Sequence, residues 1–188
     1  MKRITALIIS SLNGFSLNIV RKFAEQGYNI ALNENQNDDN IIETIQKEHK
    51  QCRTMYVPDS IKNEIDIHNL VEQISKQFRH IDIVIIHHEC KRHYTASIDE
   101  FPTENWREAF DYNLIITFAL VKTLWPHMKR QHSGNIKTSL FEQYDHIKTL
   151  ADLILFLSSD QARSITGQSI PWCLTQFYFN VDERLICQ

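Results

Sequence analysis

The chain has 188 residues, of which 43% are hydrophobic, 23% are charged and only four are glycine. This composition suits one folded domain with its own core and disfavours a disordered, collagen-like, coiled-coil or membrane-spanning chain. Twenty basic against twenty-three acidic residues give a net charge of −3, so nucleic acid is not expected as the main partner.

The N-terminus and the cysteines predict a cytoplasmic protein. The apolar run 4–9 is too short for a signal-peptide core, and no small-residue cleavage site follows it. The four cysteines stand far apart in the sequence and form no C-x-x-C pair, which is typical of a reducing compartment. We therefore expect a cytoplasmic location and no membrane contact.

Strands and helices are predicted to alternate along the first half of the chain. Apolar runs predict strands at 4–9, 28–32, 53–57 and 82–86. The segments between them predict helices at 15–26, 40–50 and 62–78. Gly27 is expected to end the first helix, and Asp59 or Ser60 to cap the third. Such alternation with short connections predicts a parallel sheet built from βαβ units.

The second half begins with a long predicted helix at about 104–130. Its apolar positions recur three or four residues apart and are Phe110, Leu114, Phe118, Val121 and Trp125. Residues 134–140 predict a fifth strand, although Lys137 and Thr138 weaken that prediction, and 147–158 is strongly apolar. Without a repeat or a linker, we expect one domain over residues 1–188.

Several segments resemble the short-chain dehydrogenase/reductase family, and among its members the 3-hydroxybutyrate dehydrogenases most. The matching segments follow the family's order and are 5–8 with 23–27, 31–33, 101–106, 124–129, and 155–162 with 165–168. The resemblance implies a Rossmann-like, doubly wound parallel sheet. It also implies a nicotinamide cofactor and hydride transfer to or from a carbonyl or alcohol carbon.

The resemblance places a phosphate-binding loop between the first strand and the first helix. The family has T-G-x-x-x-G-x-G there, and this chain keeps one glycine of three, with Ser10, Gly14, Phe15 and Ser16 at the matching positions. A helix N-terminus still favours an anion, but each added side chain is expected to intrude on the dinucleotide. NAD binding is therefore predicted to be weak or absent.

Two further residues match cofactor contacts of the family. Asn33, followed by Glu34, offers no basic group for a 2′-phosphate, which favours NAD over NADP. Asp59 follows the third strand, where the family has an aspartate that contacts the adenine ring. Capping of the third helix explains Asp59 equally well, so both interpretations stay open.

The family's catalytic set matches this chain incompletely. By resemblance, Asn113 supports a proton-relay water, Ser139 orients the substrate oxygen, Tyr144 is the general acid/base and Lys148 lowers the pKa of that tyrosine. Asn113 matches well, whereas Ser139 stands one or two places early. The gap from Ser139 to Tyr144 is too short for the family's loop, and Tyr144 and Lys148 lead straight into a segment that resembles a later helix.

A polar cluster after the fourth strand contains His87, His88, Glu89, Cys90 and His93. It misses the H-E-x-x-H zinc motif, because the second histidine falls one position too late for the same helix face. Consecutive strand residues also point to opposite sides of a sheet. A polar loop at the edge of the sheet explains the cluster better, and no metal site is predicted.

The residues after Gly134 are too few for all the elements that the family has there. The tyrosine helix and the sixth strand are predicted to be missing, so the last strand must pair with the fifth or leave an open edge. Loss of that helix would expose the apolar side of helix 104–130. These features predict a degenerate family member without dehydrogenase turnover, acting through a homo-oligomer or a protein partner. The alternative is an NAD-dependent oxidoreductase of the 3-hydroxybutyrate dehydrogenase type.

Overall fold

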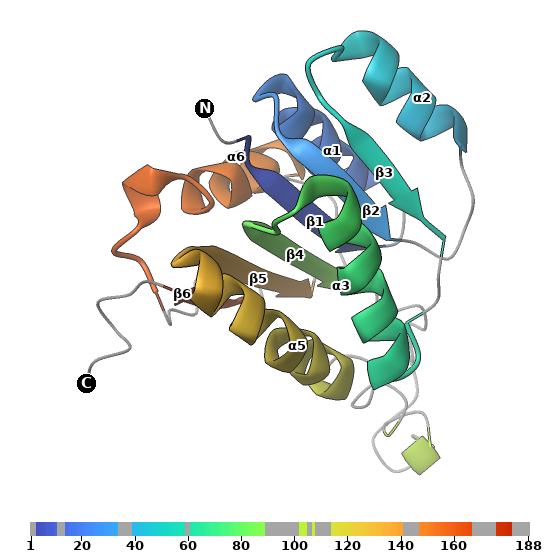
Figure 1. The fold of residues 1–188 in the computed structure, drawn as a ribbon, viewed down its shortest axis with the longest axis vertical. Helices are drawn as coiled ribbons and strands as arrows, with labels where there is room; N and C mark the ends of the chain where they lie inside the picture. Colours follow the sequence, from blue (N-terminus) through green and yellow to red (C-terminus); the bar gives the residue numbers. More distant parts are fainter. Residues whose placement is uncertain are drawn as a thin grey trace.

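The computed structural model describes residues 3–10, 14–33, 39–58, 61–88, 102–104, 107, 114–140, 147–166 and 176–181. These residues form one central sheet with helices on both of its faces (Figure 1). The predicted doubly wound, Rossmann-like architecture is therefore confirmed.

The sheet has six strands in the order β3-β2-β1-β4-β5-β6. They are β1 (Thr5–Ser10), β2 (Asn29–Asn33), β3 (Thr54–Val57), β4 (Ile83–His88), β5 (Gly134–Leu140) and β6 (Gln176–Val181). The first five are parallel, and β6 pairs antiparallel with β5. Every residue of β1 and β2 is buried, as expected for strands covered by helices on both faces.

Two separate apolar layers lie on the two faces of the sheet. On one face α1 (Gly14–Glu25), α2 (Asp39–Glu48) and α6 (Ile147–Leu157) pack against the layer that contains Ile8, Phe23 and Ile154. On the other face α3 (Glu64–Phe78) and α5 (Ile116–Gln131) pack against the layer that contains Leu7 and Leu120. A short 3₁₀ helix, Asp160–Ala162, follows α6.

The strand and helix predictions of the first half hold to within a few residues, but the cap of α3 was predicted wrongly. Asn63, not Asp59 or Ser60, caps α3: its side chain accepts hydrogen bonds from the backbone N–H groups of Ile65 and Asp66. The Asp66 carboxylate in turn accepts from the backbone N–H of Asn63, which completes a capping box.

The predicted long helix is described from residue 116 onwards. Residues 103, 104 and 107 are also helical, whereas 108–113 lie outside the described residues. The structure exposes three of its predicted apolar positions, with Leu114 54% exposed, Phe118 66% and Trp125 39%. No helix in the described part of the chain is long and apolar enough to cross a bilayer.

The C-terminal part departs from a regular Rossmann winding. A parallel strand beyond β5 would need a right-handed crossover, with its helix on the face of α3 and α5. Instead α6 lies on the face of α1, where Lys22 pairs with Asp152, and β6 returns antiparallel. The last strand thus pairs with the fifth, and the winding agrees with the predicted loss of the tyrosine helix and the sixth strand.

Within the described residues, three turns adopt the left-handed backbone conformation, and one of these three uses glycine. Gly27 ends α1 with a φ of 73°, as predicted. Arg79 and His132 end α3 and α5 with φ values of 72° and 55°. A residue with a Cβ loses about 1–2 kcal/mol in this conformation, so both helix ends carry a strain that glycine would relieve.

Candidate functional site

The carboxyl ends of the parallel strands form the edge at which an α/β sheet binds its ligands. The chain winds outward from β1 through β2 to β3, and then from β4 to β5 on the other side. The winding therefore reverses between β1 and β4, and ligands of open α/β sheets bind in the crevice outside the strands at such a point. Helix α1 begins at Gly14, soon after β1 ends, and brings its N-terminus to this place.

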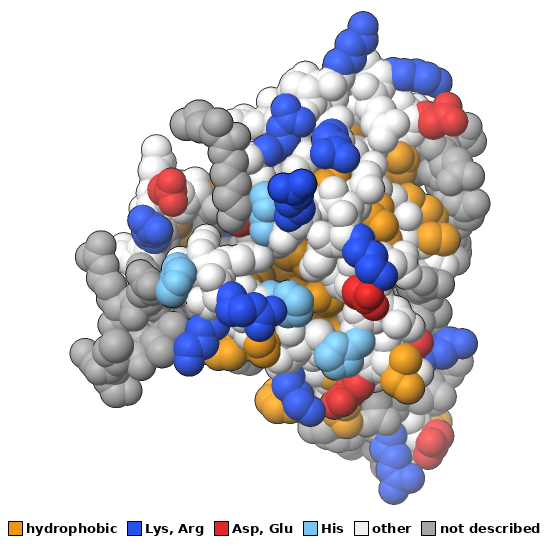
Figure 2. Space-filling model, in the orientation of Figure 1, with side chains coloured by type: hydrophobic (Ala, Val, Ile, Leu, Met, Phe, Trp, Pro, Cys, Tyr) orange, Lys and Arg blue, Asp and Glu red, His pale blue; other side chains and the backbone are white. Residues whose placement is uncertain are grey.

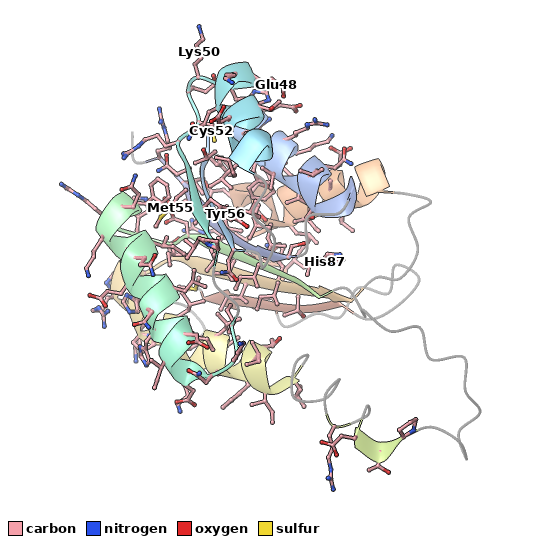
Figure 3. The ribbon with its side chains drawn as sticks, turned by 90° about the vertical axis from the view of Figure 1, so that its right-hand side faces the viewer. Glu48, Lys50, Cys52, Met55, Tyr56 and His87 are labelled. Atoms are coloured by element: carbon pink, nitrogen blue, oxygen red, sulfur yellow. The ribbon has the colours of Figure 1, made fainter. Side chains whose placement is uncertain are left out.

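A row of polar residues crosses this edge. Ser10 of β1 pairs in register with His87 of β4, and His87 pairs with Ser139 of β5. Figure 3 shows His87 at the carboxyl end of β4. Ser10 is 6% exposed and His87 2% exposed, and both have the strand parity of residues that face α1 and α6. The row thus brings Ser10 and Ser139 to the same edge of the sheet. In the sequence, only the family resemblance links these two serines.

The serines that replace the family's glycines are buried. Ser16, in the first turn of α1, is fully buried, and Ser10 is nearly so. The last glycine of the fingerprint serves close packing of helix against strand, and a small buried serine can serve the same packing. The burial of Ser16 therefore argues against the expectation that its side chain intrudes on the dinucleotide. Phe15 is the second residue of α1, and its side chain lies outside the described residues.

The ends of β2 and β3 are tied together by an amide. The Asn33 side chain is 3% exposed and donates a hydrogen bond of 3.0 Å from Nδ2 to the carbonyl oxygen of Val57. Asn33 thus helps to hold this edge of the sheet. Asp59 lies outside the described residues, but its capping interpretation loses support, because Asn63 caps α3. The adenine contact remains as the prediction for Asp59.

The four predicted catalytic residues are only partly described. Asn113 and Tyr144 lie outside the described residues. Ser139 takes its place in the row with His87, and Lys148 lies in the first turn of α6. Because α6 packs against α1, Lys148 belongs to a helix on the opposite face of the sheet from α5.

The predicted absence of a metal site stays a prediction. His87 and His88 end β4, while Glu89, Cys90 and His93 lie outside the described residues. Within the ranges that the structure describes, no three histidine, cysteine or carboxylate side chains gather as metal ligands would.

A buried lysine beside this row is a feature that the sequence did not reveal. Lys137 of β5 is 2% exposed, and its amine donates a hydrogen bond to Oδ1 of Asn135. The Asn135 amide in turn donates a hydrogen bond of 3.1 Å to the carbonyl oxygen of Leu157, at the end of α6. Burial lowers the pKa of Lys137 to about 7. From the sequence, Lys137 only weakened the strand prediction, since no local signal shows that the fold buries it.

Comparison with curated proteins finds oxidoreductases. The chain is 28% identical over 151 residues to the uncharacterized oxidoreductase YhxC of Bacillus subtilis, covering 79% of this chain and 52% of that protein. It is 26% identical over 132 residues to a D-beta-hydroxybutyrate dehydrogenase of Cupriavidus necator, covering 70% of this chain and 50% of that protein. The chain thus spans about half the length of these relatives.

Solved structures share the fold. A Bacillus thuringiensis protein assigned as a 3-oxoacyl-reductase superposes with a TM-score of 0.71 at 16% identity, covering 88% of this chain and 94% of that one. A 3-oxoacyl-[acyl-carrier protein] reductase from Brucella melitensis, in complex with NAD, superposes with a TM-score of 0.62 at 18% identity, covering 69% and 50%. At these identities the likeness concerns the fold alone.

The family model for short chain dehydrogenases matches residues 4–138, which hold β1 to β4, α5 and most of β5. The match covers well over half of the chain and includes Ser10 and His87 of the row described above. This chain therefore belongs to the short-chain dehydrogenase family.

Proposed function

We propose that the chain binds NAD at the carboxyl edge of its sheet and acts as an NAD-dependent oxidoreductase of the 3-hydroxybutyrate dehydrogenase type. The observation that carries the proposal is the burial of Ser10 and Ser16. Because both side chains lie in the protein interior, the two serines that replace family glycines would not occupy the position of a pyrophosphate at the N-terminus of α1.

The residues around this edge suit a dinucleotide better than the sequence alone indicated. A helix N-terminus supplies backbone N–H groups and a partial positive charge. Asn33 ends β2 and offers no basic group for the 2′-phosphate of NADP. By resemblance, Asp59 would contact the adenine ring. Of the two nicotinamide dinucleotides, NAD is therefore the better match.

The bound cofactor would supply the hydride acceptor or donor, and this chain would supply orientation and the proton. Ser139 would hold the substrate oxygen near the end of β5. Tyr144 would take the hydroxyl proton as the alcohol becomes a carbonyl, or return it in the reverse direction. Lys148 would keep the pKa of that tyrosine low, and Asn113 would hold the water that relays the proton.

Calorimetric titration of the purified chain with NAD tests the binding step. We expect a dissociation constant in the micromolar range, weakened by Lys148→Ala and by Ser16→Phe, which would push α1 away from the sheet. Lys50→Ala, at an exposed lysine far from this edge, is the matched control and should bind as the wild type does. No heat of binding at millimolar NAD would refute the proposal.

Turnover is measured separately as NADH formation with 3-hydroxybutyrate. Loss of activity in Tyr144→Phe with NAD binding retained would support Tyr144 as the acid/base. Binding of NAD without any turnover would favour a second function instead. The specific observation behind that second function is an exposed apolar strip, formed by Leu114 just before α5 and by Phe118 and Trp125 on α5.

In the second function, the chain has lost turnover and acts by associating through this strip with a second copy or with another protein. Water-exposed apolar area of this kind is a common mark of an interface. Light scattering tests the oligomer: we expect a mass above that of the monomer, and a shift to monomer in Phe118→Glu. A strictly monomeric, soluble wild-type protein would rule out self-association through the strip.

A further inference from the structure

The opposite edge of the sheet, where the parallel strands begin, carries a row of cations. Each of them comes shortly before a parallel strand: Arg3 before β1, Arg53 before β3, Arg79 before β4, and Lys129 and Arg130 before β5. All five side chains are exposed. Parallel strands begin at the same edge, so residues 127 positions apart in the sequence become neighbours there. We call these five residues the cationic edge.

Contacts of neighbouring residues join the segments that carry the cationic edge. The guanidinium of Arg53 lies 5.6 Å from the ring centroid of Phe78, next to Arg79 in the chain. The His80 ring nitrogen lies 2.8 Å from the carbonyl oxygen of Arg3. Gln131 donates a hydrogen bond of 3.0 Å to the carbonyl oxygen of Ile81, which joins the ends of α3 and α5.

The five cations are not held in ion pairs with carboxylates of the described residues, although Glu25, Glu48 and Asp160 are exposed at the same edge. Asp82 is mostly buried and accepts a hydrogen bond from the backbone N–H of Thr5, with His80 as its ion-pair neighbour. In the part of the chain that the structure describes, no carboxylate forms an ion pair with any of the five cations. Figure 2 shows Lys and Arg side chains, with histidines and some carboxylates among them, spread over the face that carries α3 and α5.

Helix stabilisation explains only part of this arrangement. Cations at the ends of α3 and α5 interact favourably with the helix dipoles, but Arg3 and Arg53 stand at strand starts. Arg79 also holds a left-handed backbone conformation that glycine would adopt without strain. The chain thus keeps a strained backbone at Arg79 together with an exposed cation. Strain of this kind is common at functional positions, which indicates a use for the Arg79 side chain.

We propose that the cationic edge is a docking surface for a short acidic segment of another protein. The strands from β3 to β5 span four strand spacings of about 4.8 Å, so the cationic edge is about 19 Å wide. An extended peptide of about six residues covers that width. Arginine forks bind carboxylates in pairs of hydrogen bonds, and four of the five cations are arginine.

Other occupants fit this edge less well. Two copies meeting through it would set cation against cation. A long nucleic acid would run past the row and meet the exposed carboxylate of Glu72 on α3. Figure 3 shows Glu48 and Lys50 near each other at the end of α2, so the charge there is already mixed. The edge is also opposite to the proposed NAD site, so both can be occupied together.

The test is fluorescence anisotropy with a labelled peptide of glutamates and serines, against a single-stranded RNA of equal charge. We expect the peptide to bind more tightly than the RNA, with an affinity that falls on raising the salt concentration. Arg53→Gln, Arg79→Gln and Arg130→Gln should each weaken peptide binding about two- to fivefold. Arg21→Gln, at an exposed arginine on α1, is the matched control and should leave binding unchanged.

Arg79→Gly separates docking from folding. Glycine relieves the strained turn, so this variant should melt at a higher temperature than the wild type and yet bind the peptide more weakly. Weaker binding in a more stable protein cannot come from unfolding. Absence of peptide binding at millimolar concentration, equal loss in Arg21→Gln, or tighter binding of RNA than of peptide would each overturn the proposal. NAD titration of the same variants should match the wild type.

Discussion

Replacement of Lys137 by methionine should change how the stability of this protein depends on pH. In the folded state burial lowers the pKa of this amine from 10.5 to about 7. In the unfolded chain the amine regains a pKa near 10.4. Between these two values the folded state holds Lys137 neutral while the unfolded state binds a proton. The unfolded state thus binds more protons, and the free energy of unfolding rises with pH.

The size of this effect follows from the pKa difference. A full proton difference changes the free energy of unfolding by about 1.4 kcal/mol per pH unit. At pH 7 the folded lysine is half protonated, so the slope begins at about half of that value and reaches the full value near pH 8. Raising the pH from 7 to 9 should therefore add about 2 kcal/mol to the stability of the wild type. Below pH 7 both states are protonated, and the cost of the buried charge is constant.

Urea denaturation at pH 7, 8 and 9 measures this slope. The wild type should gain stability relative to Lys137→Met by about 2 kcal/mol over this range. The lost hydrogen bond to Asn135 shifts the variant by a constant amount and leaves the slope unaffected. Lys50→Met, at an exposed lysine, should follow the wild type. Parallel stability curves for the wild type and Lys137→Met would refute the reasoning and show that the amine stays charged in the folded protein.

Three further substitutions test local features by thermal or urea denaturation. Asn63→Ala removes the cap of α3 and should cost about 1 kcal/mol, whereas Asn63→Ser should retain most of the stability. Gly134→Ala places a Cβ 2.6 Å from the Cβ of Met128, so we expect a loss of about 1–3 kcal/mol; wild-type stability would show that α5 adjusts freely. Arg79→Gly should gain about 1 kcal/mol by relieving its left-handed turn, and a loss would mean that the arginine side chain stabilises the fold.

The local sequence determined the elements of the first half and the family. Continuous apolar runs such as 4–9 mark strands that helices cover on both faces, and the spacing of Ile67, Leu70 and Ile74 marks the buried side of α3. The cap of α3 was also readable, since Asn63 and Asp66 have the spacing of a capping box. Asp59 and Ser60 were predicted as caps because they are the first polar residues after Pro58. That prediction overlooked the three-residue spacing of Asn63 and Asp66.

The tertiary structure alone decided how the second half folds and what its polar residues do. The apolar pattern of α6 is the same on either face of a sheet, and only packing places it against α1. The fold also buries Lys137, while the antiparallel pairing of β6 closes the edge that the missing strand would leave. Burial of Ser10 and Ser16 likewise depends on how closely α1 approaches the sheet.

The scarcity of glycine also separates what the sequence determined from what the tertiary structure decided. The resemblance to the family predicted the altered phosphate loop, because that loop is defined by residue type at fixed spacing and Gly14 is the one glycine of three that this chain keeps. The sequence did not show that Arg79 and His132 take left-handed turns where glycine is preferred, since backbone angles depend on how each helix ends against the sheet. Nor did it show that Arg3, Arg53, Arg79 and Arg130 share one edge. Parallel strand order alone brings together residues so far apart in the chain.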